Sequence, residues 1–311
     1  MRSKFVMPLT IIFLFGSVLN GLAVVKMYVP EVFRGAFAEI AKEYSGGRVE
    51  ILSDECSVNR DMVNKKETES KLFLLSERLD NEHMLGKDNA EYSYLISFAS
   101  SQMVLAYANK SKFSSIINQE NWPYYLRKKE VSFGLVNNFN RICNVRPLLA
   151  LKLAAYNYSQ PGLYDTLYNH SVKFESFDSM VSSLKNGEID YFITYKSSAI
   201  ENGLKYIELP NMVSLSDDCF REKYRKTYVD LPQSDGSLKR FYGDCISFML
   251  AVKKDDSKSQ EIADFIRFVL SDNSKAVLEK RGFNVSYSPE FRGRLQYLDG
   301  SLRGLVMYAG F

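Results

Sequence analysis

The chain has 311 residues, of which 46% are hydrophobic and 25% are charged, a composition typical of a folded globular protein and not of a disordered one. The formal net charge of +3 is too small to indicate a nucleic-acid-binding protein. The length allows two domains or one large domain.

The N-terminal segment has the pattern of an export signal. Arg2 and Lys4 precede the apolar run FVMPLTIIFLFGSVL, and Gly21 and Ala23 occupy positions −3 and −1 of a cleavage site. The run is short for a membrane span, and an uncleaved N-terminal anchor is the alternative. We therefore predict a signal peptide over residues 1–23 and an exported protein, located in the periplasm or on the outer face of the cytoplasmic membrane.

Strand-like and helix-like stretches alternate after this segment. Residues 23–29 and 48–52 predict strands, and residues 31–47 between them carry apolar side chains at helical spacing. Strand, helix and strand with short connections form a βαβ unit, which implies a parallel sheet. Further strands are predicted within residues 71–76, 94–109, 131–138, 204–210 and 244–254. A helix is predicted to begin near Pro147. Residues 177–203 predict a helix, a glycine turn, a strand and a second helix, and residues 259–283 predict an amphipathic helical pair.

An exported chain meets an oxidising compartment, where cysteines form disulfides. The four cysteines are Cys56, Cys143, Cys219 and Cys245, and they allow three pairings. The Cys219–Cys245 pair is favoured because these residues bracket one local segment. Four buried free thiols are the alternative, since free cysteine is commonly buried.

Motifs for catalysis or metal binding are missing from the sequence. The two histidines, His83 and His170, are far apart and flanked by polar, loop-like sequence, and no C-x-x-C occurs. A metal site, a Ser-His-Asp triad and a cofactor fingerprint therefore lack support. We expect no cofactor, and a secreted enzyme is the least favoured class of protein.

Four stretches carry a family resemblance. They are FASSQMVLAYANKSKF, NWPYYLRKKEVSFGLVN, LKNGEIDYFITYKSSAIENGLKYIELP and FIRFVLSDNSKAVLEKRGF. In this order and spacing they resemble the periplasmic molybdate/tungstate-binding proteins of ABC importers, specifically the archaeal-type branch. The likeness extends from about Val25 to about Phe283.

The resemblance implies an α/β fold of the two-lobe periplasmic-binding-protein type (type II). Each lobe is then a mixed sheet flanked by helices, and the ligand cleft lies between the lobes. The first lobe is expected to hold residues 24–108 and 209–311, and the second lobe residues 109–208.

The implied function is that of an exported solute-binding protein of an ABC importer. It would capture a small oxyanion, molybdate, tungstate or another small anion, by lobe closure and deliver it to a membrane permease. We expect a monomer that binds no nucleic acid. The alternative is a binding fold used as a sensor or protein-interaction module without an oxyanion, which predicts a cleft filled by side chains.

The ligand positions of the first lobe differ from those of the resembled family. Val32 stands where the family has a serine after its first strand. Glu55 aligns with the serine after the second strand, and Ser57 is close by. Lys71 aligns with a family aspartate, and a solvated charge is the alternative reading for Lys71.

The second lobe departs from the family at both expected metal-ligating carboxylates. Arg141 and Thr194 occupy those positions, whereas Cys143 and Arg146 are retained. An arginine has donors and no acceptor, so it cannot be an inner-sphere metal ligand. Arg141 and Thr194 are instead expected to hydrogen-bond a tetrahedral anion, with a surface or inter-lobe ion pair as the alternative role of Arg141. The sequence thus predicts weak or altered oxyanion binding.

The stretch Tyr195-Lys196-Ser197 follows a buried-strand pattern and begins a helix. The resemblance places this point in the cleft, where free N–H groups of a helix N-terminus suit an oxyanion. Tyr195 and Ser197 are therefore candidate ligand residues, and a helix cap is the alternative role of Ser197.

Overall fold

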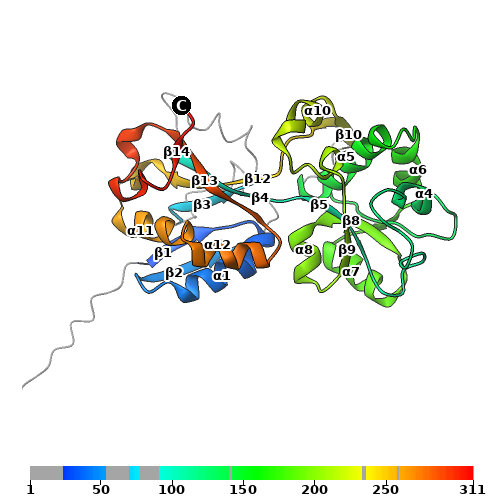
Figure 1. Cartoon of the computed structure of the whole chain (residues 1–311), viewed down its shortest axis with the longest axis horizontal. Helices are drawn as coiled ribbons and strands as arrows, with labels where there is room; N and C mark the ends of the chain where they lie inside the picture. Colours follow the sequence, from blue (N-terminus) through cyan, green and yellow to red (C-terminus); the bar gives the residue numbers. More distant parts are fainter. Residues whose placement is uncertain are drawn as a thin grey trace, which may run out of the picture.

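The computed structural model describes residues 24–53, 70–76, 91–139, 142–232, 236–257 and 259–310. They form two α/β lobes side by side, which confirms the expected two-lobe fold (Figure 1). The chain leaves the first lobe after β4 (Tyr92–Ser100) and is back in it at β12 (Ser247–Lys253). None of the described helices is long and apolar enough to span a bilayer. The predicted signal segment lies outside the described residues.

A seven-stranded mixed sheet forms the centre of the first lobe. Its strand order is β14-β13-β4-β12-β3-β1-β2. β1 pairs in parallel with β2 and β3, whereas β12 is antiparallel to β3 and β4, so the parallel β1–β2 pair confirms the predicted βαβ unit. The remaining bounds are β1 (Val24–Tyr28), β2 (Arg48–Leu52), β3 (Leu72–Leu75), β13 (Asn284–Gly293) and β14 (Met307–Tyr308).

Three helices pack on this sheet, namely α1 (Arg34–Glu43), α11 (Gln260–Val269) and α12 (Asp272–Lys280). Serine side chains cap two of them, because Ser259 accepts from Ile262 N–H and Ser271 accepts from Ser274 N–H. The amphipathic helical pair predicted over 259–283 is thereby confirmed. Single 3-10 turns connect elements of this lobe at η1 (Glu31–Phe33), η4 (Lys254–Asp256), η5 (Leu295–Tyr297) and η6 (Gly300–Leu302).

The second lobe is built around a three-stranded antiparallel sheet. β5 (Met103–Tyr107) lies between β8 (Tyr191–Tyr195) and β9 (Lys205–Glu208). β6 (Gly134–Val136) pairs in parallel with β7 (Val172–Phe174) beside it. The predicted strand over 94–109 is thus two strands, β4 in one lobe and β5 in the other.

The helices of the second lobe are α4 (Trp122–Leu126), α5 (Ile142–Asn157), α6 (Leu163–His170), α7 (Phe177–Asn186) and α8 (Lys196–Glu201). α5 begins five residues before Pro147, which corrects the predicted start of this helix. A proline inside a helix removes one hydrogen bond, and here that bond would go to the carbonyl of Cys143. The buried side chains of α5, which include Leu148 and Leu151, outweigh that loss.

Asp190, which precedes β8, is a structural carboxylate. It is buried, and its oxygens accept from the backbone N–H groups of Lys112 at 2.9 Å and Ser132 at 2.8 Å. The Lys112 ammonium lies 3.3 Å from the same carboxylate. Asp190 therefore joins two loops of the second lobe to the start of β8.

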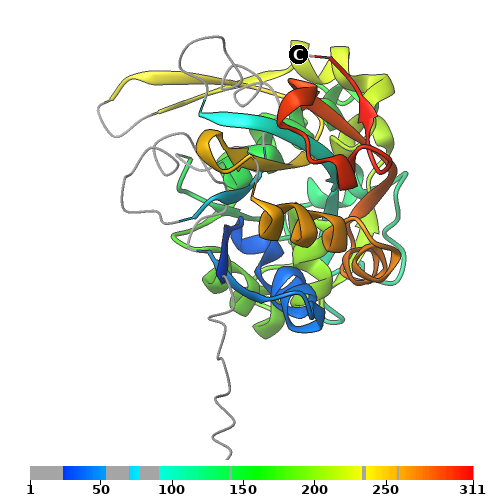
Figure 2. The ribbon, with the colours of Figure 1, turned by 90° about the vertical axis from the view of Figure 1, so that its left-hand side faces the viewer.

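A two-stranded ribbon of β10 (Tyr228–Pro232) and β11 (Leu238–Tyr242) extends from the main body of the structure (Figure 2). It packs on α5, as does α9 (Asn211–Ser214), and η3 (Asp218–Phe220) and α10 (Arg221–Lys226) connect them. The lobe boundaries expected from the sequence stay a prediction. This packing leads us to propose that residues 211–242 belong with the second lobe and that the chain returns to the first lobe at residues 243–246.

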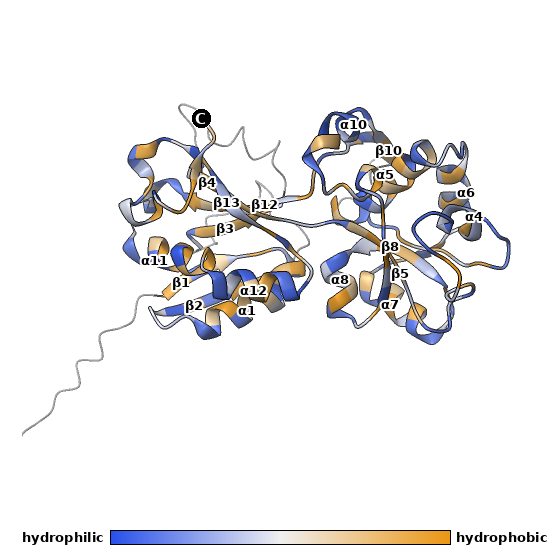
Figure 3. Cartoon of the chain, in the orientation of Figure 1, coloured by the Kyte–Doolittle hydropathy of each residue, from blue (hydrophilic) through white to orange (hydrophobic). Residues whose placement is uncertain are grey.

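Apolar side chains are concentrated inside both lobes and also where the lobes meet. Figure 3 shows hydrophobic residues along the central strands and hydrophilic residues on the outer surfaces of the helices. One continuous cluster of buried residues contains Phe33 and Phe248 of the first lobe together with Tyr195 of the second lobe. The two lobes are therefore in direct apolar contact in this conformation.

The favoured Cys219–Cys245 disulfide is wrong, because both residues carry free thiols. Cys219 is exposed, whereas Cys245 is buried beside Asp218 and Arg221, so the thiols occupy different environments. Burial raises the pKa of Cys245 to about 12. Cys143 is disulfide-bonded, which also excludes four free thiols, and Cys56 lies outside the described residues.

Candidate ligand site between the lobes

Arg146 links the two lobes. It lies in α5, is only 5% exposed, and donates from Nη1 to the Tyr195 hydroxyl at 2.6 Å. From Nη2 it donates to the main-chain oxygen of Ser76, at the end of β3 in the first lobe, at 2.9 Å. The structure thus brings together Arg146 and Tyr195, both predicted from the sequence, with Ser76, which was not predicted.

The surroundings of Arg146 leave its charge available to an anion. Its two acceptors among the described residues are a phenol and a carbonyl, and both are neutral. A guanidinium has five N–H donors, and two of them are used by the described residues. Because an isolated buried charge is costly, an anion between the lobes would stabilise this arrangement.

Two buried hydroxyl groups add to the polar character of the site. Ser76 Oγ and Ser197 Oγ have no hydrogen-bond partner among the described residues, and their residues are 2% and 3% exposed. Buried polar atoms normally have a partner, and a bound solute or water supplies one where the protein does not. Ser76 follows a strand that is parallel to its neighbour β1, and this position at the carboxyl end of a strand is the signal that could have identified it.

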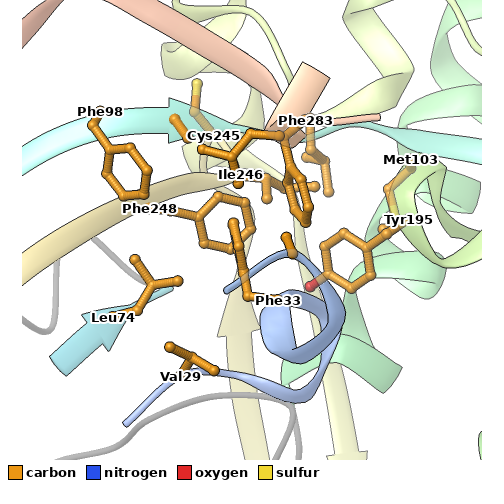
Figure 4. Packing of buried hydrophobic residues seen from close by; sticks show 14 of the residues in the cluster. Val29, Phe33, Leu74, Phe98, Met103, Tyr195, Cys245, Ile246, Phe248 and Phe283 are labelled. Carbon is orange, nitrogen blue, oxygen red and sulfur yellow. The ribbon is translucent and has the colours of Figure 1, made fainter. Parts of the chain in front are cut away.

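The first-lobe wall of the site is apolar. Phe33 stacks on Phe283 with ring centroids 4.0 Å apart and meets Phe248 edge-on at 4.4 Å. Figure 4 shows these three rings next to one another, with the Tyr195 ring beside them. Val32, a predicted site residue, is half-buried against the same cluster and brings no hydrogen-bond donor in its side chain.

Of the remaining residues singled out from the sequence, some lie in the described part of the chain and others do not. Thr194 is buried in β8, and alternation along a strand places its side chain on the opposite face from Tyr195. Lys71 forms an ion pair with Asp256 at 2.8 Å, in agreement with a solvated surface charge. Glu55, Ser57 and Arg141 lie outside the described residues.

Helix α8 packs tightly against the first lobe through Gly282. This glycine has φ +85°, and a Cβ placed on it would lie 2.7 Å from Ile200 Cδ1 and 3.3 Å from the Ser197 nitrogen. The first turn of α8 thus meets backbone of the other lobe. The site therefore belongs to a conformation in which the lobes are in contact.

A charged cluster borders this contact. A Cβ on Gly35 would lie 2.7 Å from Arg281 Nη1 and 2.9 Å from Glu201 Oε1, so side chains of both lobes meet above this glycine. Arg281 is also paired with Glu39 at 2.7 Å. Partial desolvation raises the pKa of Glu201 even though the residue as a whole is exposed, and the nearby Arg281 opposes this shift.

A cavity of about 260 Å³ lies near the junction between the lobes, apart from this site. Its lining combines serine hydroxyls with groups of both charge signs, including Ser97, Ser247, Asp218, Arg221 and Glu290. The carboxylates of Asp218 and Glu290 would repel an anion. Arg146, Tyr195 and Ser197 are not among its lining residues, and they form the better candidate site for an anion.

Comparison with known proteins connects this geometry to a family. Residues 25–284 match the family described as bacterial extracellular solute-binding protein. An uncharacterized solute-binding protein of Petrotoga mobilis is 27% identical over 198 residues, which cover 62% of this chain and 61% of the relative. The molybdate/tungstate-binding protein WtpA of Pyrococcus abyssi is 26% identical over 212 residues, which cover 60% of each protein. The chain thus matches about three fifths of the length of these relatives.

Solved structures share the fold. The periplasmic molybdate-binding protein of Azotobacter vinelandii superposes with a TM-score of 0.53 at 13% identity, covering 84% of this chain and 99% of that one. The substrate-binding domain of a molybdenum ABC transporter from Clostridium difficile, described as putative, gives a TM-score of 0.51 at 15% identity, with 84% and 98% covered. At this level of identity the likeness concerns the fold alone.

Proposed function

Because this chain belongs to the family of bacterial extracellular solute-binding proteins, which are binding proteins and not enzymes, we propose that it captures a small anion between its lobes. Binding favours the closed conformation, because the anion contacts groups of both lobes only when they meet. The closed protein then delivers the anion to an ABC permease in the membrane. We place this activity outside the cytoplasm, in the periplasm or on the outer face of the membrane.

The buried guanidinium of Arg146 is the observation that carries this proposal. It combines a full positive charge with donors that no described residue uses, at the junction of the lobes, and its described partners are neutral. The hydroxyls of Ser76 and Ser197 offer two further donors. Charge-assisted hydrogen bonds from such groups are the usual means of holding an oxyanion in a site from which water is excluded.

The donor set favours outer-sphere recognition of the anion. Guanidinium and hydroxyl groups bind the oxygens of an intact tetrahedral oxyanion, such as molybdate or tungstate, or of a carboxylate, without ligating a central metal. The apolar wall formed by Phe33, Phe248 and Phe283 gives the first lobe few donors for such an ion. We therefore propose weaker or altered selectivity relative to the relatives named for molybdate and tungstate.

A thermal-shift titration tests this proposal. The protein is melted with molybdate, tungstate, sulfate, phosphate and small carboxylates, each over a concentration series. An anion at about 100 times its dissociation constant should stabilise the folded state by about 2.7 kcal/mol. We expect one of these anions to produce a saturable shift in the parent protein.

Matched variants connect the shift to the site. Arg146→Gln should abolish the saturable shift, and Arg146→Lys should retain part of it because the charge is kept. Arg48→Gln removes an exposed arginine at the start of β2 and should leave the shift unchanged. Each shift is measured from the melting temperature of the same variant without ligand. A shift that persists in Arg146→Gln would move the anion site elsewhere.

A second candidate function is a binding fold without a small ligand. The observation in its favour is the close apolar packing of the first-lobe wall, together with the contact between Gly282 and α8. Such packing stabilises closed lobes in the absence of an anion. A folded, unloaded protein that shifts with none of the tested anions would support this function over anion capture.

A further inference from the structure

The outer face of the β10–β11 ribbon is exposed and rich in apolar groups. Antiparallel pairing places three cross-strand pairs on this face, namely Tyr228 with Tyr242, Asp230 with Arg240, and Pro232 with Leu238. Leu238 is 71% exposed and Tyr242 is 56% exposed. The opposite face of the ribbon carries the buried residues Val229 and Leu231.

Cationic groups lie directly over these rings. The Arg240 guanidinium is 3.9 Å from the centroid of the Tyr228 ring, and Lys152 Nζ of α5 is 5.5 Å from the same centroid. One turn further along α5, Tyr156 is 70% exposed and lies 5.9 Å from Lys223 Nζ of α10. We call the connected set of Lys152, Tyr156, Lys223, Tyr228, Leu238, Arg240 and Tyr242 the ribbon patch.

The free charge of this region is positive. Asp230 pairs with Arg240 through two hydrogen bonds of 2.7 and 2.9 Å, so that arginine is largely neutralised. Lys152 and Lys223 in the patch, and Lys226 and Lys239 beside it, form no ion pair with an acid in the part of the chain that the structure describes. The surface therefore combines exposed tyrosine and leucine side chains with lysines that form no close ion pair among the described residues, although Lys152 is near enough to Asp230 to help lower the pKa of that carboxyl.

From these observations we propose that the ribbon patch docks the protein on an anionic phospholipid surface. Tyrosine places an apolar ring next to a polar hydroxyl, and lysine extends an apolar stem to a charged end, so both suit the headgroup region of a bilayer. Leu238 and Pro232 form the last described pair at the far end of this ribbon, so the ribbon can present Leu238 to that region. Lysines near an anionic surface each add to the attraction.

A protein partner fits this composition less well. Protein–protein interfaces are enriched in tyrosine and arginine but depleted in lysine. In the ribbon patch and its border, the charges that remain unneutralised among the described residues are lysines, and the arginine is already paired within the ribbon. Anionic lipid headgroups supply diffuse negative charge that requires no matching shape, and they therefore suit the surface of a projecting ribbon.

Vesicle co-sedimentation of the full chain tests the proposal. Vesicles of phosphatidylglycerol mixed with phosphatidylcholine are compared with vesicles of phosphatidylcholine alone, at low and high salt. We expect binding to the anionic vesicles that weakens as salt increases. Lys152→Gln combined with Lys223→Gln should weaken that binding about 25-fold, because each lysine contributes about a five-fold factor.

Two further variants complete the test. Leu238→Ser combined with Tyr242→Ser should also weaken binding. Lys128→Gln combined with Lys185→Gln should not, because Lys128 follows α4 and Lys185 lies in α7, both outside the ribbon patch. The N-terminal apolar segment is common to the parent and all variants, so differences in their vesicle binding report on the ribbon patch. Equal melting temperatures of the parent and the variants show that the variants fold. Equal binding of the parent and both patch variants, or binding that ignores phosphatidylglycerol, would overturn the proposal. This outcome is independent of the anion titration.

Discussion

The two sides of the candidate site, where the lobes meet, differ in chemistry. The second-lobe wall presents donors: Arg146 contacts the Tyr195 hydroxyl, and the buried Ser197 follows Tyr195 in the first turn of α8. The first-lobe wall presents the stacked rings of Phe33 and Phe283 and the aliphatic Val32, with Ser76 at its edge.

This difference separates two properties of a binding protein. Under the proposed function, the polar wall would set the attraction for an anion, because charge and directed hydrogen bonds determine it. The apolar wall sets how stable the closed lobes are without a ligand, because buried apolar area stabilises contact in a non-directional way. Substitutions in the two walls should therefore act on different measurements.

The largest expected effect comes from the apolar wall. Phe33→Ala removes a fully buried ring that contacts Phe248 and Phe283, and it should lower the free energy of unfolding by about 3–5 kcal/mol. Urea denaturation followed by circular dichroism measures this change. Val32→Ala, at the half-buried neighbouring position, serves as the control and should cost much less. Equal losses in the two variants would show that the aromatic contacts of Phe33 contribute little.

The contact between Gly282 and α8 should give the next largest effect. Gly282→Ala combines a left-handed backbone with a clash against Ile200, and we expect a loss of about 1–3 kcal/mol and a larger radius of gyration in small-angle scattering. Gly203→Ala is the matched control, since Gly203 also has a positive φ of +63° but nothing lies within 4 Å of an added Cβ. If both variants scatter alike, the clash does not separate the lobes.

Removing a hydroxyl from the polar wall should change the free energy of unfolding less than the two substitutions above, and it should increase it. Ser197→Ala eliminates a buried oxygen without a described partner, so the free energy of unfolding of the unliganded protein should rise by about 1 kcal/mol. The same variant should bind the anion less tightly. Ser198→Ala, one residue further along α8, is the control for helix propensity. A loss of stability in Ser197→Ala would indicate that this hydroxyl already has a partner.

The smallest effect concerns Glu201 and depends on pH. Partial desolvation of its carboxyl raises the pKa, so the folded state disfavours the carboxylate. This destabilisation is present above the folded-state pKa and is lost as the pH falls below the ordinary range of glutamate. Glu201→Gln should therefore stabilise the protein by a few tenths of a kcal/mol near neutral pH and not in acid. Urea denaturation at both pH values measures this difference. A gain of the same size at both pH values would exclude the carboxylate charge as its cause.

Local periodicity was sufficient to predict most of the regular elements that build the lobes. The alternation of strand and helix patterns predicted β1, α1 and β2 as a parallel unit, and it predicted the helix, turn, strand and helix over residues 177–203. These predictions succeed because side-chain spacing and turn residues act over a few positions. The same information did not reveal the β10–β11 ribbon, whose short strands carry mostly exposed side chains.

The sequence alone thus determined the α/β class, the family resemblance and two of the residues that meet at the site, Arg146 and Tyr195. Only the tertiary structure decided that Ser76, 70 positions before Arg146, accepts a hydrogen bond from it. It also decided that Phe33, Phe248 and Phe283 form one wall and that Cys219 and Cys245 remain apart as free thiols. The physical reason is that these contacts join segments far apart in the chain. Close packing of the whole molecule fixes such contacts, whereas residue spacing within one segment does not.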